Sequence, residues 1–217
     1  MAEVLSRRPS SLYYVYALID RVPRRWRPPA SGVGGGSVEA QRIRDVVLIV
    51  SRIVDSVPRT PRTQALHDDV LASLMDAEAV APLPFGTTVV DLASWVEARL
   101  SGLRDALAVV RGSVEMTVRL LRLDADVDGP HLRTMAERLI ERAGLPHWRY
   151  RPAANPTNVA ASLSFLVPRD EVSAFLARIA PVAARAAGLA VVPTGPAPAY
   201  SFVSSADMAA SALAPAG

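Results

Sequence analysis

The sequence predicts an α+β protein of two domains, and two patterns support this expectation. Runs rich in β-branched and aromatic residues alternate with stretches whose apolar side chains recur at helical spacing. In the second half the order is strand, helix, strand, strand, helix, strand, which is that of a ferredoxin-like βαββαβ fold. We therefore expect an N-terminal α/β domain at residues 1–112 and a C-terminal ferredoxin-like domain at residues 113–217, the latter with a short flexible tail.

Strands open the first half. Residues 12–19 read Leu-Tyr-Tyr-Val-Tyr-Ala-Leu-Ile, a composition that predicts a buried strand. Two further strands are expected at residues 38–44 and 46–54, although the periodicity of the second also permits a helix. Between the first two strands, the segment at residues 23–37 is rich in proline and glycine and predicts a loop.

Two helices follow in the first half. Thr60 and Pro61 offer an N-cap with proline at the first helical position, and predict a helix over residues 61–80. The segment at residues 85–87 is expected to form a short strand. Asp91 then caps a second helix, and Gly112 ends it. Its apolar residues form one narrow stripe, at Leu92, Val96, Leu100, Leu103, Leu107 and Val110.

The second half has the clearer alternation. Apolar residues at 114, 116, 118 and 120 alternate with Glu115, Thr117 and Arg119, which predicts a strand with one buried and one solvent-exposed face. A helix is expected to start at Gly129 and Pro130 and to stop at Gly144. The remaining predicted elements are a strand at residues 148–151, a strand at 159–167, a helix at 169–187 and a strand at 189–192.

Composition excludes several classes of protein. The chain has no cysteine, so disulfides, thiolate metal sites and cysteine nucleophiles are absent. All 24 basic residues are arginines against 21 acidic residues, and the net charge of +3 is too small to imply a nucleic acid partner. No apolar run approaches the roughly 20 residues of a membrane helix, and no signal peptide is evident. We expect a cytoplasmic protein that does not enter a membrane.

Three local patterns suggest ligands, and each has a simpler interpretation. Residues 124–129 copy the start of a calcium-binding loop, but its twelfth position is Met135 instead of glutamate, so an acidic turn that caps a helix is favoured. Residues 32–37 are glycine-rich without the lysine of a phosphate-binding loop, which favours a flexible linker. His67, His131 and His147 have no metal spacing, and His67 is expected at the surface or at a helix end.

A basic and aromatic cluster at Arg24, Arg25, Trp26 and Arg27 resembles a nucleic acid contact. A solvated loop anchored by Trp26 is favoured, because no other face concentrates arginine. RNA-binding ferredoxin-like domains stack bases on aromatic residues of their central strands. Here those strands hold one aromatic residue, Phe165, and its register places it in the core.

Two turn-rich segments are the most specific features of the chain. Residues 83–88 read Leu-Pro-Phe-Gly-Thr-Thr, and residues 194–203 read Thr-Gly-Pro-Ala-Pro-Ala-Tyr-Ser-Phe-Val. Each combines glycine, proline and an aromatic ring, which allows a sharp turn and then seats the ring in an apolar pocket. Together with residues 13–16, His67, Glu115 and the segment at residues 165–169, they resemble the gas vesicle protein GvpL/GvpF family.

This resemblance implies a fold and a set of structural residues. Family members are accessory proteins of gas vesicle formation, with an N-terminal α/β domain and a C-terminal ferredoxin-like domain. The matching positions are Tyr13, Tyr16, His67, Phe85, Gly86, Thr87, Glu115, Gly195, Pro196, Tyr200, Ser201 and Phe202. Two positions depart from the family pattern: Pro84 stands where an arginine is common, and Ala197 stands where a tryptophan is common.

The expected function is therefore assembly without catalysis. The resemblance implies contacts with the hydrophobic shell protein, with other accessory gas vesicle proteins, or with both, and a location on the gas vesicle. No catalytic residue, cofactor or metal is expected. Two alternatives stay open: a ferredoxin-like regulatory module with a ligand at the Asp124 turn, and an RNA-binding protein. A hydrolase ranks last, since no nucleophile elbow accompanies His67.

Overall fold

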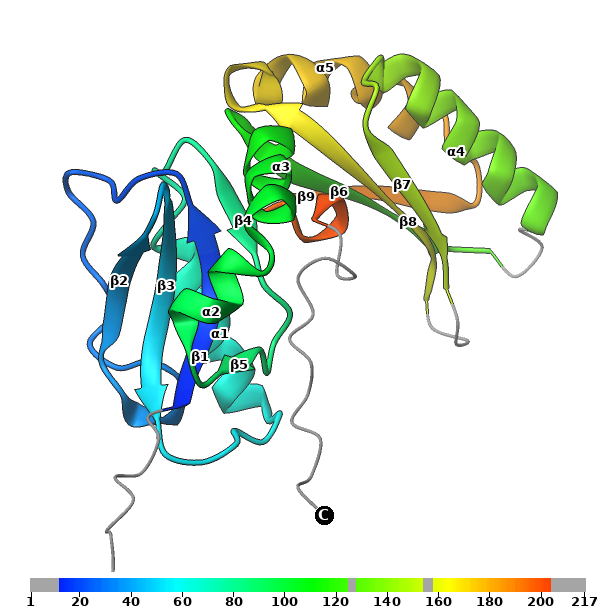
Figure 1. Ribbon diagram of the computed structural model, residues 1–217. Helices are drawn as coiled ribbons and strands as arrows, with labels where there is room; N and C mark the ends of the chain where they lie inside the picture. The colour runs from blue at the N-terminus through cyan, green and yellow to red at the C-terminus, as the bar shows by residue number, and fades with distance from the viewer. Residues whose placement is uncertain (1–11, 125–127, 154–157, 204–217) are drawn as a thin grey trace, which may run out of the picture. The chain divides into compact units, whose positions relative to one another are not determined.

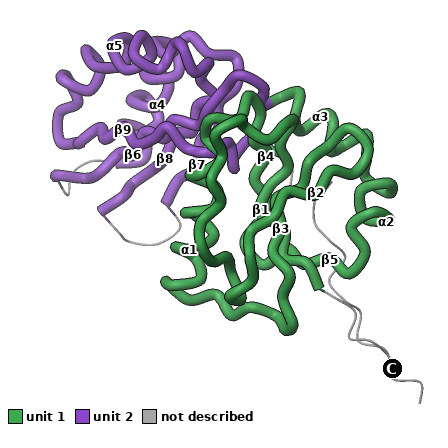
Figure 2. The backbone as a smooth tube through the Cα atoms, turned by 90° about the vertical axis from the view of Figure 1, so that its left-hand side faces the viewer, with its two compact units in different colours: residues 1–109, 203–217 green, residues 110–202 purple. Residues whose placement is uncertain are grey.

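The computed structural model describes residues 12–124, 128–153 and 158–203 (Figure 1). The chain forms two compact units (Figure 2): residues 110–202 make up one, and the described residues before and after them make up the other. Each unit has an antiparallel sheet covered by helices, so the predicted α+β class is confirmed. Of the predicted tail, residues 204–217 lie outside the described residues.

The sheet of the first unit is built around its first strand. The strands are β1 (Leu12–Ile19), β2 (Val38–Ile43), β3 (Val46–Ile53), β4 (Val80–Pro82) and β5 (Thr88–Val89), in the order β2-β3-β1-β4, with β5 also paired to β1. All pairs are antiparallel. Residues 14–19 of β1 are fully buried, which explains the nearly continuous apolar run in its sequence.

Helices cover both faces of this sheet. They are α1 (Pro61–Ala72), α2 (Leu92–Glu97) and α3 (Leu100–Val110), and a 3₁₀ turn η1 lies at Val33–Gly35. Figures 1 and 2 place α1 and α2 on opposite faces. Thr60 caps α1 through a reciprocal pair of bonds with Thr63, and Asp91 caps α2 through the N–H groups of Ala93 and Ser94.

The second unit has the element order expected from the sequence. Its strands are β6 (Ser113–Arg122), β7 (Trp148–Pro152), β8 (Val159–Pro168) and β9 (Leu189–Ala197), in the order β7-β8-β6-β9. Its helices are α4 (Gly129–Ala143) and α5 (Val172–Ala183), with 3₁₀ turns η2 (Arg169–Glu171) and η3 (Tyr200–Phe202). Both helices cover the same face of the sheet (Figure 1), and Phe165 of β8 packs against Phe175 of α5 with ring centroids 5.3 Å apart.

Several predicted boundaries in the first unit are wrong. The helix expected over residues 61–80 ends at Ala72, because Val80 is needed in β4, which pairs with β1. The expected strand at residues 85–87 is a turn that precedes β5. The single helix expected after Asp91 is divided at residues 98–99 into α2 and α3. Neither helix break is marked by glycine or proline, so tertiary packing overrides the local signal there.

Two further expectations are corrected. The helix predicted over residues 169–187 starts with η2 and ends at Ala183, and the last strand extends to Ala197. The glycine-rich segment at residues 32–37 is not a flexible linker: Val33 is fully buried, and its backbone N–H donates to the Tyr16 hydroxyl at 2.7 Å.

Candidate functional site

Four aromatic side chains form the centre of the first unit, here called the ring cluster: Tyr14, Tyr16, His67 and Phe85. Tyr14 and Tyr16 alternate along β1 and therefore point to the same face of the sheet, where α1 places His67. The Tyr14 and Tyr16 ring centroids are 4.8 Å apart, and the His67 ring lies 5.6 Å from both Tyr16 and Phe85. The first three side chains have no exposed surface.

The polar atoms of the ring cluster are hydrogen-bonded. The Tyr14 hydroxyl lies 2.9 Å from Nδ1 of His67 and accepts the backbone N–H of Gly86 at 3.1 Å. Because this hydroxyl oxygen already accepts a bond, its own proton is available to Nδ1 of a neutral imidazole. The Tyr16 hydroxyl lies 3.0 Å from the Ser51 hydroxyl. Buried polar groups with such partners stabilise one packing arrangement.

Burial shifts the pKa values in this cluster. Removal of His67 from water disfavours the imidazolium ion and lowers its pKa to about 4. The same desolvation raises the pKa of both tyrosines, although the N–H of Gly86 works against it at Tyr14. The cluster is therefore uncharged at neutral pH. The expectation that His67 lies at the surface or at a helix end is wrong, because His67 shares the buried stripe of α1 with Val70 and Leu71.

The turn at residues 84–87 is attached to this cluster. The hydroxyl of Thr87 donates to the carbonyl of Pro84 at 2.7 Å, and the backbone carbonyl of Thr87 accepts the N–H of Val15 on β1 at 2.9 Å. Gly86 has a φ of 92°, a conformation that side chains disfavour. The guanidinium of Arg59 lies 5.0 Å from the centroid of the Phe85 ring. The Phe-Gly-Thr residues thus fix a turn on the sheet.

A second polar group lies in the second unit and is called the Glu115 network. Glu115, on β6, was expected on the solvent face, but only 6% of its surface is exposed. Its carboxylate accepts the backbone N–H and the hydroxyl of Ser201, both at 2.8 Å. The Ser201 hydroxyl also lies 3.1 Å from the Ser164 hydroxyl, and Thr117 donates to Glu115 at 3.4 Å. The side chain of Glu115 is buried because the segment after β9 folds over it.

The end of β9 approaches β6 very closely. Gly195 has a φ of 121°, and a Cβ atom there would lie 2.8 Å from the Glu115 carbonyl oxygen and 2.9 Å from the Met116 sulfur. The bond from Gly195 to Pro196 is cis. Phe202 is buried and lies 5.5 Å from the Arg149 guanidinium. The C-terminal segment is thus held through both its backbone and its ring.

The structure brings most of the predicted site residues into these two places, one in each unit. Tyr13 is half-buried and contacts Arg52, whereas Pro196 and Tyr200 are exposed. The important residue that sequence reasoning left out of the site is Tyr14, whose hydroxyl joins α1 to the Gly86 turn. The sequence feature that could have identified Tyr14 is its position in the aromatic run of the first strand.

Within the described ranges, the other patterns singled out in the sequence form no ligand site. Residues 125–127 of the acidic turn lie outside the described residues, and Asp128 caps α4 by accepting the N–H of His131 at 2.9 Å. The Trp26 indole donates to the Ser73 hydroxyl at 3.0 Å and packs on the core, which supports an anchoring role. Among the described residues, no three acidic, histidine or cysteine side chains are placed to hold a metal, and no helix could cross a membrane.

Comparison with known proteins gives a single family. The family model of gas vesicle synthesis protein GvpL/GvpF matches residues 12–146 and 132–204. The crystal structure of the gas vesicle protein GvpF from Anabaena sp. PCC7120 is similar, with a TM-score of 0.76 and 16% identity over 89% of this chain and 96% of that chain. GvpF from Microcystis aeruginosa gives a TM-score of 0.74 and 11% identity over 90% and 99%. No curated protein matches the sequence.

Proposed function

We propose that this chain, which belongs to the gas vesicle synthesis protein GvpL/GvpF family, is an assembly factor that performs no reaction. Family membership supports a role in gas vesicle formation. In this role the protein binds the hydrophobic shell protein, other accessory gas vesicle proteins, or both, while a vesicle nucleates and grows. It does so in the cytoplasm, at the vesicle.

The proposal is supported by the structural role of the family residues. Tyr16, His67, Thr87, Glu115 and Phe202 are buried. Hydrogen bonds from the buried groups reach loop backbone, from Tyr14 to Gly86 in the first unit and from Glu115 to Ser201 in the second. Tyr14 and His67, a pair that resembles a general base and its partner, have no exposed surface that a substrate could reach. Residues used in this way define the shape of a surface that other proteins recognise.

A physical need for such a partner exists in vesicle assembly. A shell subunit whose apolar surface will face gas must keep that surface covered before it joins the shell, since large exposed apolar patches lead to aggregation. An accessory protein with a rigid, preformed surface meets this need at a low cost in ordering entropy.

We also propose that the two predicted domains, residues 1–112 and 113–217, are the functional parts of the protein. The order β7-β8-β6-β9, with α4 and α5 on one face, supports a ferredoxin-like assignment for the second. The family residues listed from the sequence are proposed as the structural residues of these domains. For the departures at Pro84 and Ala197 the structure offers no specific consequence.

The proposal is tested by deleting the gene in a vesicle-forming host and counting vesicles by electron microscopy. We expect few or misshapen vesicles, and recovery when the wild-type gene is returned on a plasmid. Purified protein should in addition retain the shell protein or an accessory protein when the two are co-expressed. Normal vesicles in the deletion strain would refute the proposed role.

A further inference from the structure

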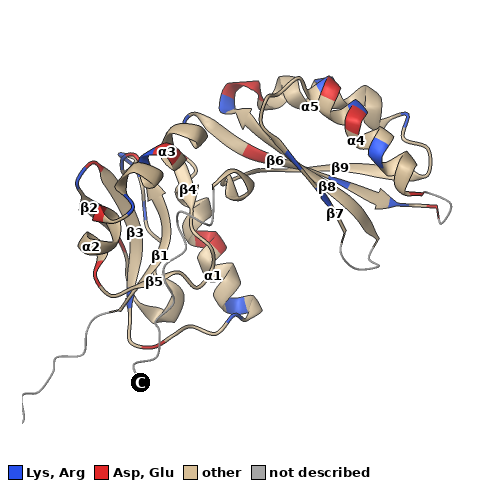
Figure 3. Cartoon of the chain, turned by 45° about the vertical axis from the view of Figure 1, so that its right-hand side comes forward, with Lys and Arg blue, Asp and Glu red and all other residues tan. Residues whose placement is uncertain are grey.

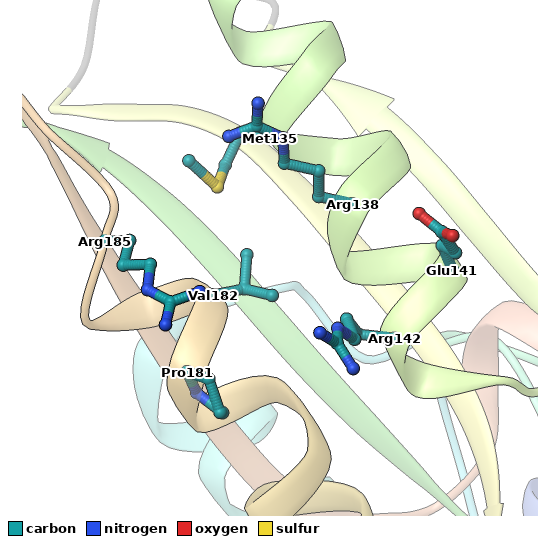
Figure 4. A pocket seen from close by; sticks show the side chains of 7 residues that line it. All are labelled: Met135, Arg138, Glu141, Arg142, Pro181, Val182 and Arg185. Carbon is teal, nitrogen blue, oxygen red and sulfur yellow. The ribbon is translucent and has the colours of Figure 1, made fainter.

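A pocket lies between α4 and α5 on the side of the helices away from the sheet (Figure 4). Its volume is about 230 Å³, and its apolar part comes from Met135, Pro181 and Val182. Arg138 and Arg142 line it from α4, and Arg185 lines it from the turn that follows α5. Figure 4 shows these three arginine side chains arranged around Val182.

The charge of this pocket is not balanced. Three arginines and one acidic residue, Glu141, line it. Some exposed arginines elsewhere do have acidic partners, for example Arg44 with Glu97 at 2.7 Å and Arg104 with Asp45 at 2.9 Å. In the part of the chain that the structure describes, no side-chain hydrogen bond or ion pair engages the pocket arginines. Figure 3 shows both basic and acidic residues along the helices of this unit.

The size of the pocket limits what can bind there. Pockets for small molecules usually measure about 300 to 1,000 Å³ and bury most of the ligand. A pocket of about 230 Å³ is smaller and half-open, and it fits one or two side chains of a docked protein segment better than a whole metabolite. Met135 is only 3% exposed and has an unbranched side chain, so it can adapt to the shape of an inserted group.

The chemistry of the lining selects the inserted group. Each guanidinium presents paired N–H donors that match a carboxylate in a bidentate manner, whereas the floor offers only apolar contacts. The complementary ligand therefore has a carboxylate beside an aliphatic side chain. A row of solvated arginines would satisfy the charge equally well. It would not explain why α4 and the turn after α5 place three arginines around one apolar pocket.

We propose that this pocket docks an acidic segment of a partner protein, with a carboxylate held by the arginines and a neighbouring aliphatic side chain on Met135 and Val182. The identity of the partner rests on the proposed function, which places it among the gas vesicle proteins. The docking chemistry itself does not depend on that function and can be measured separately.

Binding is tested on the full chain with a labelled peptide that alternates aspartate and leucine. Its control replaces each aspartate by asparagine. The pocket variant is R138Q/R142Q/R185Q, and the charge-matched control is R62Q/R133Q/R151Q, which removes three exposed arginines outside the pocket. We expect the pocket variant to bind the acidic peptide at least about tenfold more weakly by fluorescence anisotropy, whereas the control variant binds as wild type does.

Three results would overturn the pocket proposal. Equal losses in both triple variants would show that net charge alone attracts the peptide. Equal binding of the aspartate and asparagine peptides would show that no carboxylate is recognised. Inorganic phosphate is the third probe: if it binds to the pocket and the acidic peptide does not, the site is one for small anions and the proposal is wrong.

A test in cells separates this proposal from the proposed function. The deletion strain is complemented with each triple variant, and vesicles are counted. We expect only the pocket variant to fail. If the pocket variant restores normal vesicles and the empty vector does not, the docking proposal falls while the assembly role stands. If the deletion itself has no effect, the assembly role falls, and the peptide measurements still decide the pocket.

Discussion

His67 is a buried imidazole whose protonation state is fixed by its surroundings. Its ring has no exposed surface, and Nδ1 contacts the Tyr14 hydroxyl at 2.9 Å. Because the hydroxyl of Tyr14 also accepts the N–H of Gly86, loss of the neutral imidazole affects α1, β1 and the Gly86 turn together. The charge state of one side chain is thus coupled to the stability of the whole ring cluster.

We predict that this coupling makes folding stability depend on pH. The pKa of His67 is about 4 in the folded protein and 6.5 in the unfolded chain, so the unfolded chain binds more protons between these values. The free energy of unfolding therefore falls as pH drops below 6.5, by about 2 kcal/mol at pH 5 from this residue. Urea unfolding of wild type and of His67→Phe at pH 7 and pH 5 measures the difference.

His131→Asn is the control for that experiment. His131 is exposed, so its replacement should leave the pH dependence as in wild type. Acidic residues titrate equally in all three proteins and cancel in the comparison. If His67→Phe loses as much stability as wild type between pH 7 and pH 5, His67 is not the group responsible.

Glu115 and Ser201 are predicted to be strongly coupled. The carboxylate accepts two bonds from one serine, and Glu115→Gln would turn an acceptor into a donor that faces other donors. We expect Glu115→Gln to lower the free energy of unfolding by about 1 to 3 kcal/mol. In a double-mutant cycle with Ser201→Ala, the effects should be clearly less than additive. Glu137→Gln, on the exposed side of α4, should change stability little. Additive effects of the pair would contradict the coupling.

At the scale of elements, local patterns located strands better than helix ends. The strand predicted at residues 12–19 matches β1, and those at 38–44 and 46–54 match β2 and β3 to within one residue. Alternation and composition determine most strands locally, although the last strand, predicted at residues 189–192, extends to Ala197. No local residue marks the end of α1. The chain must leave the helix before Val80, because β4 pairs with β1, which is distant in sequence.

The same distinction applies to the site residues. The spacing of His67, Val70, Leu71 and Leu74 was a local signal that His67 faces the core. For Glu115 there was none: strict alternation places it on the solvent face, and the serine that covers it is 86 residues away. The loop after β9 is thus the element that decides its environment, and alternation within one strand cannot reveal such a loop.

The close approach at the end of β9 leads to a further prediction. Gly195→Ala adds a Cβ atom against backbone and sulfur atoms of β6 at a positive φ, and both effects are unfavourable. We expect a loss of about 1 to 3 kcal/mol in the free energy of unfolding. Gly129→Ala is the matched control, since a Cβ atom there meets open space. Equal stability of the two variants would show that β9 is not held closely against β6.

At the scale of the whole molecule, each unit has its own core. The core of the second unit draws its buried residues from positions 116–189, among them Val118, Leu139, Phe165 and Phe175. The ring cluster belongs to a core that draws on positions 14–80. Neither core contains a residue of the other unit. A unit with a complete core and a closed set of strand pairs should not need its neighbour in order to fold.

We therefore predict that residues 113–203 fold alone. The fragment contains β6 to β9, α4, α5 and the Ser201 bonds to Glu115. It should show one cooperative unfolding transition in urea, because a domain of this size usually unfolds as a single unit. Introducing Glu115→Gln should destabilise the fragment as much as it destabilises the full chain, since its hydrogen-bond partners Thr117 and Ser201 lie within the fragment. A fragment without a cooperative transition, or one insensitive to Glu115→Gln, would show that the first unit is required for the second to fold.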